Sequence, residues 1–125
     1  MAIHRLSERG LNLILKGKVK EPSTCVIKFY SNGCHMCHNL QPYYQDIAER
    51  EEYEDLHFFA FNVDNGDPEL EKRLKFEGVP TIGLVKVYPQ MKRKAKVRIL
   101  KDPENPNSET WFTTRDIRDF IDREK

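Results

Sequence analysis

Two cysteines separated by two residues are the part of the sequence best suited to chemistry. They lie in the run Cys34-His35-Met36-Cys37, directly after the β-branched and aromatic segment 24–30. That segment predicts a buried strand, and the apolar spacing after it predicts a helix that the pair opens. Unpaired N–H groups and the helix dipole stabilise a thiolate at that end. The pattern favours thiol–disulfide chemistry, with Cys34 as the attacking nucleophile and Cys37, one turn on, as the resolving thiol.

Two further features bear on this chemistry. His35 lies between the cysteines, where its partial positive charge favours the thiolate. Val79-Pro80 comes just before a second apolar segment, and a proline at the start of a strand gives up a hydrogen-bond donor of the sheet. Such a position suits a cis peptide, which would expose the Val79 backbone beside the cysteines. An extended substrate strand would then be able to pair with it.

The same residues also match two metal-binding patterns. Cys34 to His38 fits the C-x-x-C-H pattern of c-type haem attachment, with His38 as an axial ligand, but that reading needs an exported protein. A zinc site would use Cys34, Cys37 and one histidine as ligands. These are three of the four ligands of a tetrahedral site, and the sequence has no second C-x-x-C to supply the fourth. Other candidate ligands are His4, Cys25 and His57. We predict no metal and no cofactor, and expect Cys25 to be a buried apolar residue.

Composition restricts the protein class. The 125 residues suit one domain, and 38% hydrophobic with 33% charged residues argues against a membrane protein or a disordered chain. The 21 Lys and Arg nearly cancel the 20 Asp and Glu, which is unlike a nucleic-acid binder. No apolar run resembles a secretory signal or a membrane span. We therefore expect a cytoplasmic monomer that binds neither nucleic acid nor membrane.

The elements that must position the cysteines follow from apolar periodicity and capping residues. A single domain over 1–125 is expected, with an N-terminal helical extension over 1–20 and a core over 24–123. Segments rich in β-branched and aromatic residues predict strands at 24–30, 57–63, 81–87 and 95–100. Helical spacing and caps predict helices at 5–16, at 35–52, from Asp67 to Gly78 and from Thr113 onward. The connection 88–94 is too short for a crossover helix, so the last two strands form an antiparallel hairpin. The class is α/β, a four-stranded mixed sheet with helices on both faces.

With these residues in view, the chain resembles the thioredoxin-fold family over about residues 25–99. The markers are the strand Val26–Tyr30, the Cys34/Cys37 pair, Pro42, Asn62-Val63-Asp64 and Val79-Pro80-Thr81. The resemblance implies a sheet order of 2-1-3-4 in predicted strand numbers and a cis Pro80 packed against the active-site disulfide. It implies an apolar substrate groove lined by Gly33, Val79 and Pro80. It also implies an oxidoreductase in electron transport, with protein disulfides as substrates and an unidentified reductase or dithiol donor as partner.

The chain departs from the family pattern at several positions. Gly33 stands where the family usually has tryptophan, His35-Met36 where it has Gly-Pro, and Lys28 where it has a buried acid. The N-terminus is expected to lack the family's extra first strand. We hypothesise that Lys28 points toward the cysteines and tunes a thiolate. The alternative is a thioredoxin-fold adaptor or metal-binding module that uses Cys34, Cys37 and a nearby histidine without turnover.

Overall fold

The chain alternates short strands and helices around a central sheet. The computed structural model describes residues 2–89 and 95–125. The strands are β1 (Ile3–Arg5), β2 (Ser23–Tyr30), β3 (His57–Asn62), β4 (Thr81–Val87) and β5 (Val97–Ile99). The α-helices are α1 (Glu8–Leu15), α2 (His35–Ala48), α3 (Leu70–Leu74) and α4 (Thr114–Glu124), with short 3₁₀ turns at Glu51–Tyr53 and Val63–Asn65. The predicted hairpin connection over 88–94 lies mostly outside the described residues.

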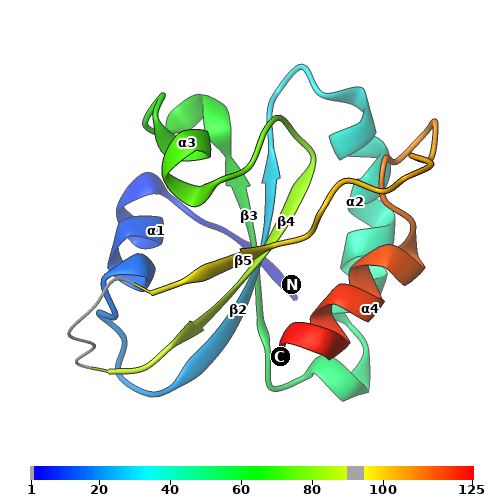
Figure 1. The fold of residues 1–125 in the computed structure, drawn as a ribbon. Coiled ribbons are helices and arrows are strands. Elements are labelled where there is room, and N and C mark those ends of the chain that lie inside the picture. The colour runs from blue at the N-terminus through cyan, green and yellow to red at the C-terminus, as the bar shows by residue number, and fades with distance from the viewer. Residues whose placement is uncertain (1, 90–94) are drawn as a thin grey trace.

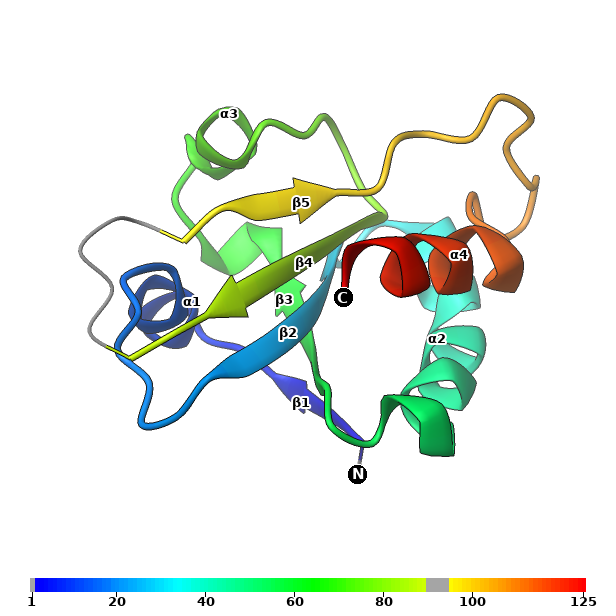
Figure 2. The ribbon, with the colours of Figure 1, turned by 60° about the horizontal axis from the view of Figure 1, so that its bottom comes forward.

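The five strands form one mixed sheet in the order β1-β3-β2-β4-β5. β1 and β2 both run parallel to β3, whereas β4 runs antiparallel to both β2 and β5. Helices α1 and α3 cover one face of the sheet, and α2 and α4 cover the other (Figures 1 and 2). The end of β2 leads directly into α2, so the first turn of α2 begins at the edge of the sheet where β4 starts.

Side-chain alternation along β2 builds both cores. Cys25, Ile27 and Phe29 join the cluster under α1 and α3, and Val26 joins the cluster under α2 and α4. The second cluster is completed mainly by aromatic and aliphatic side chains of α2, α4 and β3, including Leu40, Tyr44, Ile47, Phe58, Ile117 and Phe120. Because β2 is central and fully buried over Cys25–Phe29, any polar side chain on it is enclosed as well.

The prediction of a four-stranded sheet is wrong, because a fifth strand, β1, pairs with β3 at the sheet edge. The expected absence of an extra first strand is wrong for the same reason, and part of the predicted helical extension is this strand. β1 has three residues, of which only Ile3 is buried. Such a short segment shows too little alternation of apolar and polar residues to predict a strand. The four predicted strands keep their relative order within the larger sheet, as β3-β2-β4-β5.

Side-chain caps fix the starts of α1 and α4. Ser7 accepts a hydrogen bond from Gly10 N (3.0 Å) and begins α1. Thr113 and Asp116 form a reciprocal capping box at the start of α4. α3 is shorter than predicted: Asp67 caps a turn through Glu69 N, and the helix begins only at Leu70.

None of the helices in the described part of the chain is both long and apolar enough to span a bilayer.

Candidate active site

Cys34 and Cys37 are joined by a disulfide at the start of α2. Cys34 is the N-cap residue, with extended backbone, and its Sγ accepts a hydrogen bond from Cys37 N at 3.1 Å. The geometry follows from the sequence, because a helix that starts one residue after Cys34 brings Cys37 back over it after one turn, with a Cα–Cα distance of 5.3 Å. Cys34 is half-buried, whereas Cys37 is 1% exposed. An incoming thiolate can therefore reach only the Cys34 sulfur.

The start of β4 lies against the same sulfur. Cys34 Sγ is 3.8 Å from Val79 O, and the Val79–Pro80 peptide is cis. Pro80 is buried, Val79 is half-buried and Gly33 is exposed, with open space around it. Gly78 directly precedes Val79. Its φ of +72° is a conformation that favours glycine, and its N–H donates to Glu71 Oε2 at 3.2 Å. The structure thus brings Cys34 and the backbone of Val79 together at the rim of the sheet.

Lys28 lies beneath the first turns of α2, on the same face of β2 as Val26. Its Nζ donates to Gln41 Oε1 at 2.6 Å and lies 3.4 Å from Cys37 O. The ammonium is also 5.6 Å from the ring centroids of Tyr30 and Tyr44. The residue is 2% exposed, and this burial lowers the pKa of its amine from 10.5 to about 8. Lys28 therefore faces the backbone of Cys37, and no hydrogen bond within the described residues joins it to Cys34.

A polar network ties down the turn that precedes Cys34. Asn32 N donates to Asp64 Oδ2 (2.9 Å), and Asn62 Nδ2 donates to Asn32 Oδ1 (2.8 Å). His38 Nε2 lies 3.0 Å from Asn32 O, so it must carry the proton of this hydrogen bond. Asn32 itself belongs to no motif that points to a role in the site. The polar run Asn62-Val63-Asp64 after β3 was the available signal, since loop residues beyond parallel strands meet at one edge of a sheet.

Of the remaining candidate residues, His35 lies between the two cysteines and Cys25 lies in the core. His35 is exposed on α2. Cys25 is 3% exposed in the core, and burial raises the pKa of its thiol to about 11. Among residues 2–89 and 95–125, no group of three or more His, Cys, Asp or Glu side chains is placed to hold a metal ion. His4 and His57 therefore do not converge with Cys34 and Cys37 on a common ligand set in that part of the chain.

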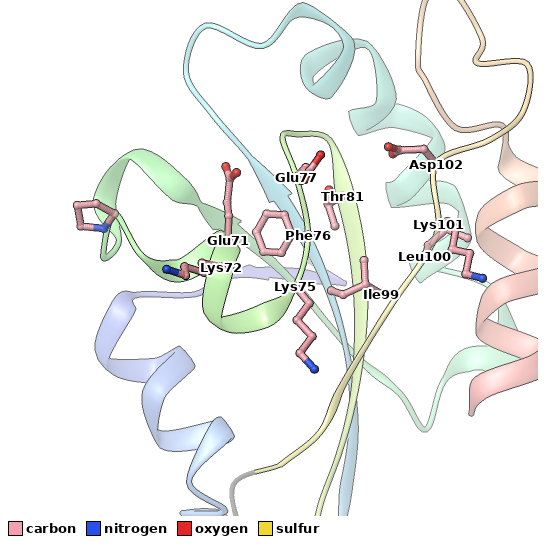
Figure 3. A pocket seen from close by; sticks show the side chains of 11 residues that line it. Glu71, Lys72, Lys75, Phe76, Glu77, Thr81, Ile99, Leu100, Lys101 and Asp102 are labelled. Atoms are coloured by element: carbon pink, nitrogen blue, oxygen red, sulfur yellow. The ribbon is translucent and has the colours of Figure 1, made fainter.

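A pocket of about 850 Å³ opens beside the loop that carries Val79 and Pro80. It lies between α3 and the end of β5, and Figure 3 shows Phe76 and Thr81 near the middle of the lining residues, with Glu77 and Asp102 above them and Ile99 below. Charges of both signs line it: Glu71, Glu77 and Asp102 against Lys72, Lys75 and Lys101. Two of the acids are engaged, since Glu71 accepts from Gly78 N and Asp102 accepts from Trp111 Nε1.

The chain is similar in sequence and in fold to known proteins. The family model described as Thioredoxin matches residues 14–101. Thioredoxin Mala s 13 of Malassezia sympodialis is 13% identical, with a TM-score of 0.64 over 97% of this chain and 89% of that chain. Thioredoxin f2, solved with ferredoxin:thioredoxin reductase, is 17% identical, with a TM-score of 0.65 over 97% and 93%. Reduced Schistosoma mansoni thioredoxin is 17% identical, with a TM-score of 0.63 over 97% and 96%. A search of curated proteins gave no match.

Proposed function

The chain belongs to the thioredoxin family, and from that premise we propose that it exchanges disulfides with protein substrates through Cys34 and Cys37. The family and the redox-capable pair support a thiol–disulfide oxidoreductase in general. The observation that carries the proposal is the asymmetry of the disulfide, which joins a half-buried sulfur at a helix N-terminus to a buried one. In such an arrangement the accessible Cys34 sulfur attacks the target disulfide, and the buried Cys37 sulfur resolves the mixed disulfide.

In the reducing direction, the Cys34 thiolate attacks one sulfur of a target disulfide and forms a mixed disulfide, releasing the other target sulfur as a thiolate. Cys37 then loses its proton and attacks Cys34 Sγ, which closes the Cys34–Cys37 bond and releases the second target thiolate. Two electrons pass from the pair to the target. The oxidising direction is the same sequence reversed. The helix N-terminus stabilises the Cys34 thiolate in both directions, which supports its role as nucleophile.

The proposed substrate groove comprises Gly33, Val79 and Pro80. The contact between Cys34 Sγ and Val79 O supports it, because a peptide that crosses Cys34 passes the backbone of Val79, a half-buried residue. The open space around Gly33 leaves room for the target chain on the other side of the sulfur. His35 and Lys28 are proposed to tune the thiols, His35 from the solvent side and Lys28 from beneath α2.

The partners proposed are protein disulfides and a reductase or dithiol donor. The structural likeness to a thioredoxin solved together with its reductase supports a donor of that kind. A single domain over 1–125, a monomeric state, a place in electron transport and a cytoplasmic location complete the proposal. In the reducing direction, a reducing compartment returns the exchange pair to the dithiol after each cycle.

The test is trapping of mixed disulfides. Cys37→Ser removes the resolving thiol, so the variant is expected to remain covalently bound to its targets, seen as thiol-reversible high-mass species on non-reducing gels. Cys34→Ser removes the attacking thiol and is expected to trap nothing. Cys25→Ala is the matched control, because it removes the third cysteine and leaves the pair intact. Equal trapping by both serine variants would contradict the assigned roles.

A non-turnover adaptor is the second candidate, favoured by the buried lysine under Cys37 where a proton acceptor would assist resolution. Reduction of insulin by dithiothreitol separates the two functions. We expect the wild-type protein to accelerate it, and both the Cys34→Ser and Cys37→Ser variants to fall to the background rate. A wild-type rate at background would reject the oxidoreductase and favour the adaptor.

A further inference from the structure

Lys28 is a buried cation without a counter-charge while the disulfide is closed. No carboxylate in the described part of the chain lies within ion-pair distance of its Nζ. Its partners are neutral: the Gln41 amide oxygen, the Cys37 carbonyl oxygen and two tyrosine rings. An unpaired ammonium in such a site is unfavourable, because its neutral partners replace lost hydration only in part. The oxidised state therefore carries an electrostatic penalty at this point.

Reduction of the pair creates the missing anion close by. Breaking the Cys34–Cys37 bond takes up two electrons and leaves sulfur as thiolate or thiol at the start of α2. Cys37 is as buried as Lys28, so a charge on its sulfur is poorly hydrated and needs a nearby cation. Lys28 Nζ already contacts the Cys37 carbonyl at 3.4 Å, which places the ammonium at that turn of the helix. Each buried charge thus lowers the electrostatic cost of the other.

We propose that Lys28 is the counter-charge of the Cys37 thiolate, and that it biases the pair toward the dithiol, so that the disulfide form oxidises target dithiols. A small-molecule disulfide such as oxidised glutathione then takes up the two electrons and restores the Cys34–Cys37 bond. This inference rests on the proposed function and adds its direction. Lys28 acts through Cys37 and is a positioning residue in this scheme. Gln41 Oε1, at 2.6 Å, holds the ammonium under the helix.

The proposed oxidation runs in two steps. A target thiolate attacks Cys34 Sγ, the half-buried sulfur, and the Cys34–Cys37 bond breaks with Cys37 leaving as a thiolate in the helical turn whose Cys37 carbonyl contacts the ammonium. A leaving thiolate of lower pKa departs faster, which is the kinetic advantage that Lys28 supplies. The second target thiol then gives its proton to solvent and attacks the target sulfur of the mixed disulfide, expelling Cys34 as a thiolate. Two electrons have passed from the target to the pair, and the target disulfide is closed.

The experiment measures the equilibrium of the pair with glutathione, followed by alkylation and mass spectrometry. Lys28→Met is expected to lower the equilibrium constant for reduction of the pair about tenfold, which is about 30 mV for a two-electron couple. Lys28→Gln keeps a hydrogen-bond donor without the charge, so it is expected to match Lys28→Met. Lys86→Met makes the same exchange at an exposed position on β4 and is expected to stay within about twofold of wild type.

The outcomes separate this inference from the proposed function. Because the glutathione equilibrium needs no protein target, it reports on Lys28 even if trapping by Cys37→Ser fails. Values for Lys28→Met within about twofold of wild type, or shifted toward easier reduction, would overturn the inference and leave the exchange reaction standing. Lys28→Gln behaving like wild type would also overturn it, because hydrogen bonding rather than charge would then set the equilibrium. Melting curves of each oxidised variant establish that it is folded.

Discussion

The side chains on the two faces of strand β2 differ in chemistry: one face is apolar and the other includes a buried charge. Toward α1 and α3 it presents Cys25, Ile27 and Phe29, which are packed among apolar side chains. On the alternate face it presents Val26 and Lys28, and there the lysine meets the helix that the disulfide opens. One strand therefore contributes a thiol to an inert core and a cation to a reactive site. The difference shows that reactivity here depends on which face a side chain occupies.

The cysteines make the comparison sharpest. Cys25 and Cys34 are nine positions apart, but Cys25 is enclosed by core side chains that raise the pKa of its thiol to about 11. Cys34 caps a helix and is reached from solvent. A thiol inside a sheet has no unpaired N–H groups to stabilise its anion, whereas a helix N-terminus offers several.

The largest expected effect is on alkylation. In the reduced protein at pH 7, a pKa of about 11 leaves roughly one Cys25 in ten thousand as thiolate, against a few per cent for an ordinary thiol. We therefore expect iodoacetamide to modify Cys34 at least roughly 300-fold faster than Cys25, as followed by peptide mass spectrometry. Denaturant should abolish the difference. Comparable rates in the folded protein would break the contrast between the two faces.

The next effect concerns the stability of the oxidised protein. Lys28→Met removes a buried ammonium whose pKa is lowered to about 8, so the variant is expected to be more stable at pH 7 by on the order of 3 kcal/mol. The sign follows from linkage: between about pH 8 and 10.5 the unfolded chain binds more protons than the folded one. Wild-type stability rises across that window, and the advantage of the variant shrinks. Below about pH 8 both states are protonated and the full penalty is present.

Urea titrations of both oxidised proteins at several pH values between 7 and 10.5 measure this difference. Lys86→Met, at an exposed position on β4, provides the control for loss of one positive charge. A variant that is less stable than wild type at pH 7 would show that Lys28 contributes more through its hydrogen bonds than its burial costs.

A third prediction concerns Cys25 on the apolar face. Cys25→Ala deletes a buried sulfur and leaves a small cavity, which is expected to cost about 1–2 kcal/mol of unfolding free energy. The glutathione equilibrium of the Cys34/Cys37 pair should not change, because Cys25 points into the opposite core. Calorimetry and the glutathione equilibrium measure the two quantities. A shifted equilibrium would mean that the faces are coupled through the strand.

Much of the scaffold could be predicted, because it depends on local signals. The segment after Pro80 is rich in β-branched residues, and proline is tolerated at the start of a strand, so the sequence predicts a strand over 81–87. The structure has β4 at Thr81–Val87. β1 could not be predicted, since a three-residue segment with one buried side chain becomes a strand only by pairing with β3. Its existence is a consequence of tertiary structure, which periodicity does not record.

The candidate site also has a part that the sequence predicts and a part that depends on tertiary structure. Spacing alone places Cys37 one turn after Cys34, and the structure bonds them. The run Asn62-Val63-Asp64 indicates polar groups at this edge of the sheet, but it does not identify Asn32 as their partner, because the hydrogen bond joins residues 32 positions apart. The burial of Lys28 runs against the ordinary distribution of lysine, and its contacts with Gln41 and Cys37 depend on how α2 packs on β2.

The smallest expected effect tests whether every polar group on the α2 side bears on the disulfide. The Tyr44 hydroxyl lies 2.8 Å from Phe59 O on β3 and 3.2 Å from Val26 O on β2. Its single hydrogen is therefore donated to one or shared between these two backbone carbonyls. Tyr44→Phe keeps the ring beside Lys28 and is expected to cost about 1 kcal/mol of unfolding free energy. The glutathione equilibrium should stay within about twofold, because the ammonium keeps its other contacts. A shift as large as that expected for Lys28→Met would mean that the buried polar groups of this face act on the disulfide together, with Lys28 as one member of the set.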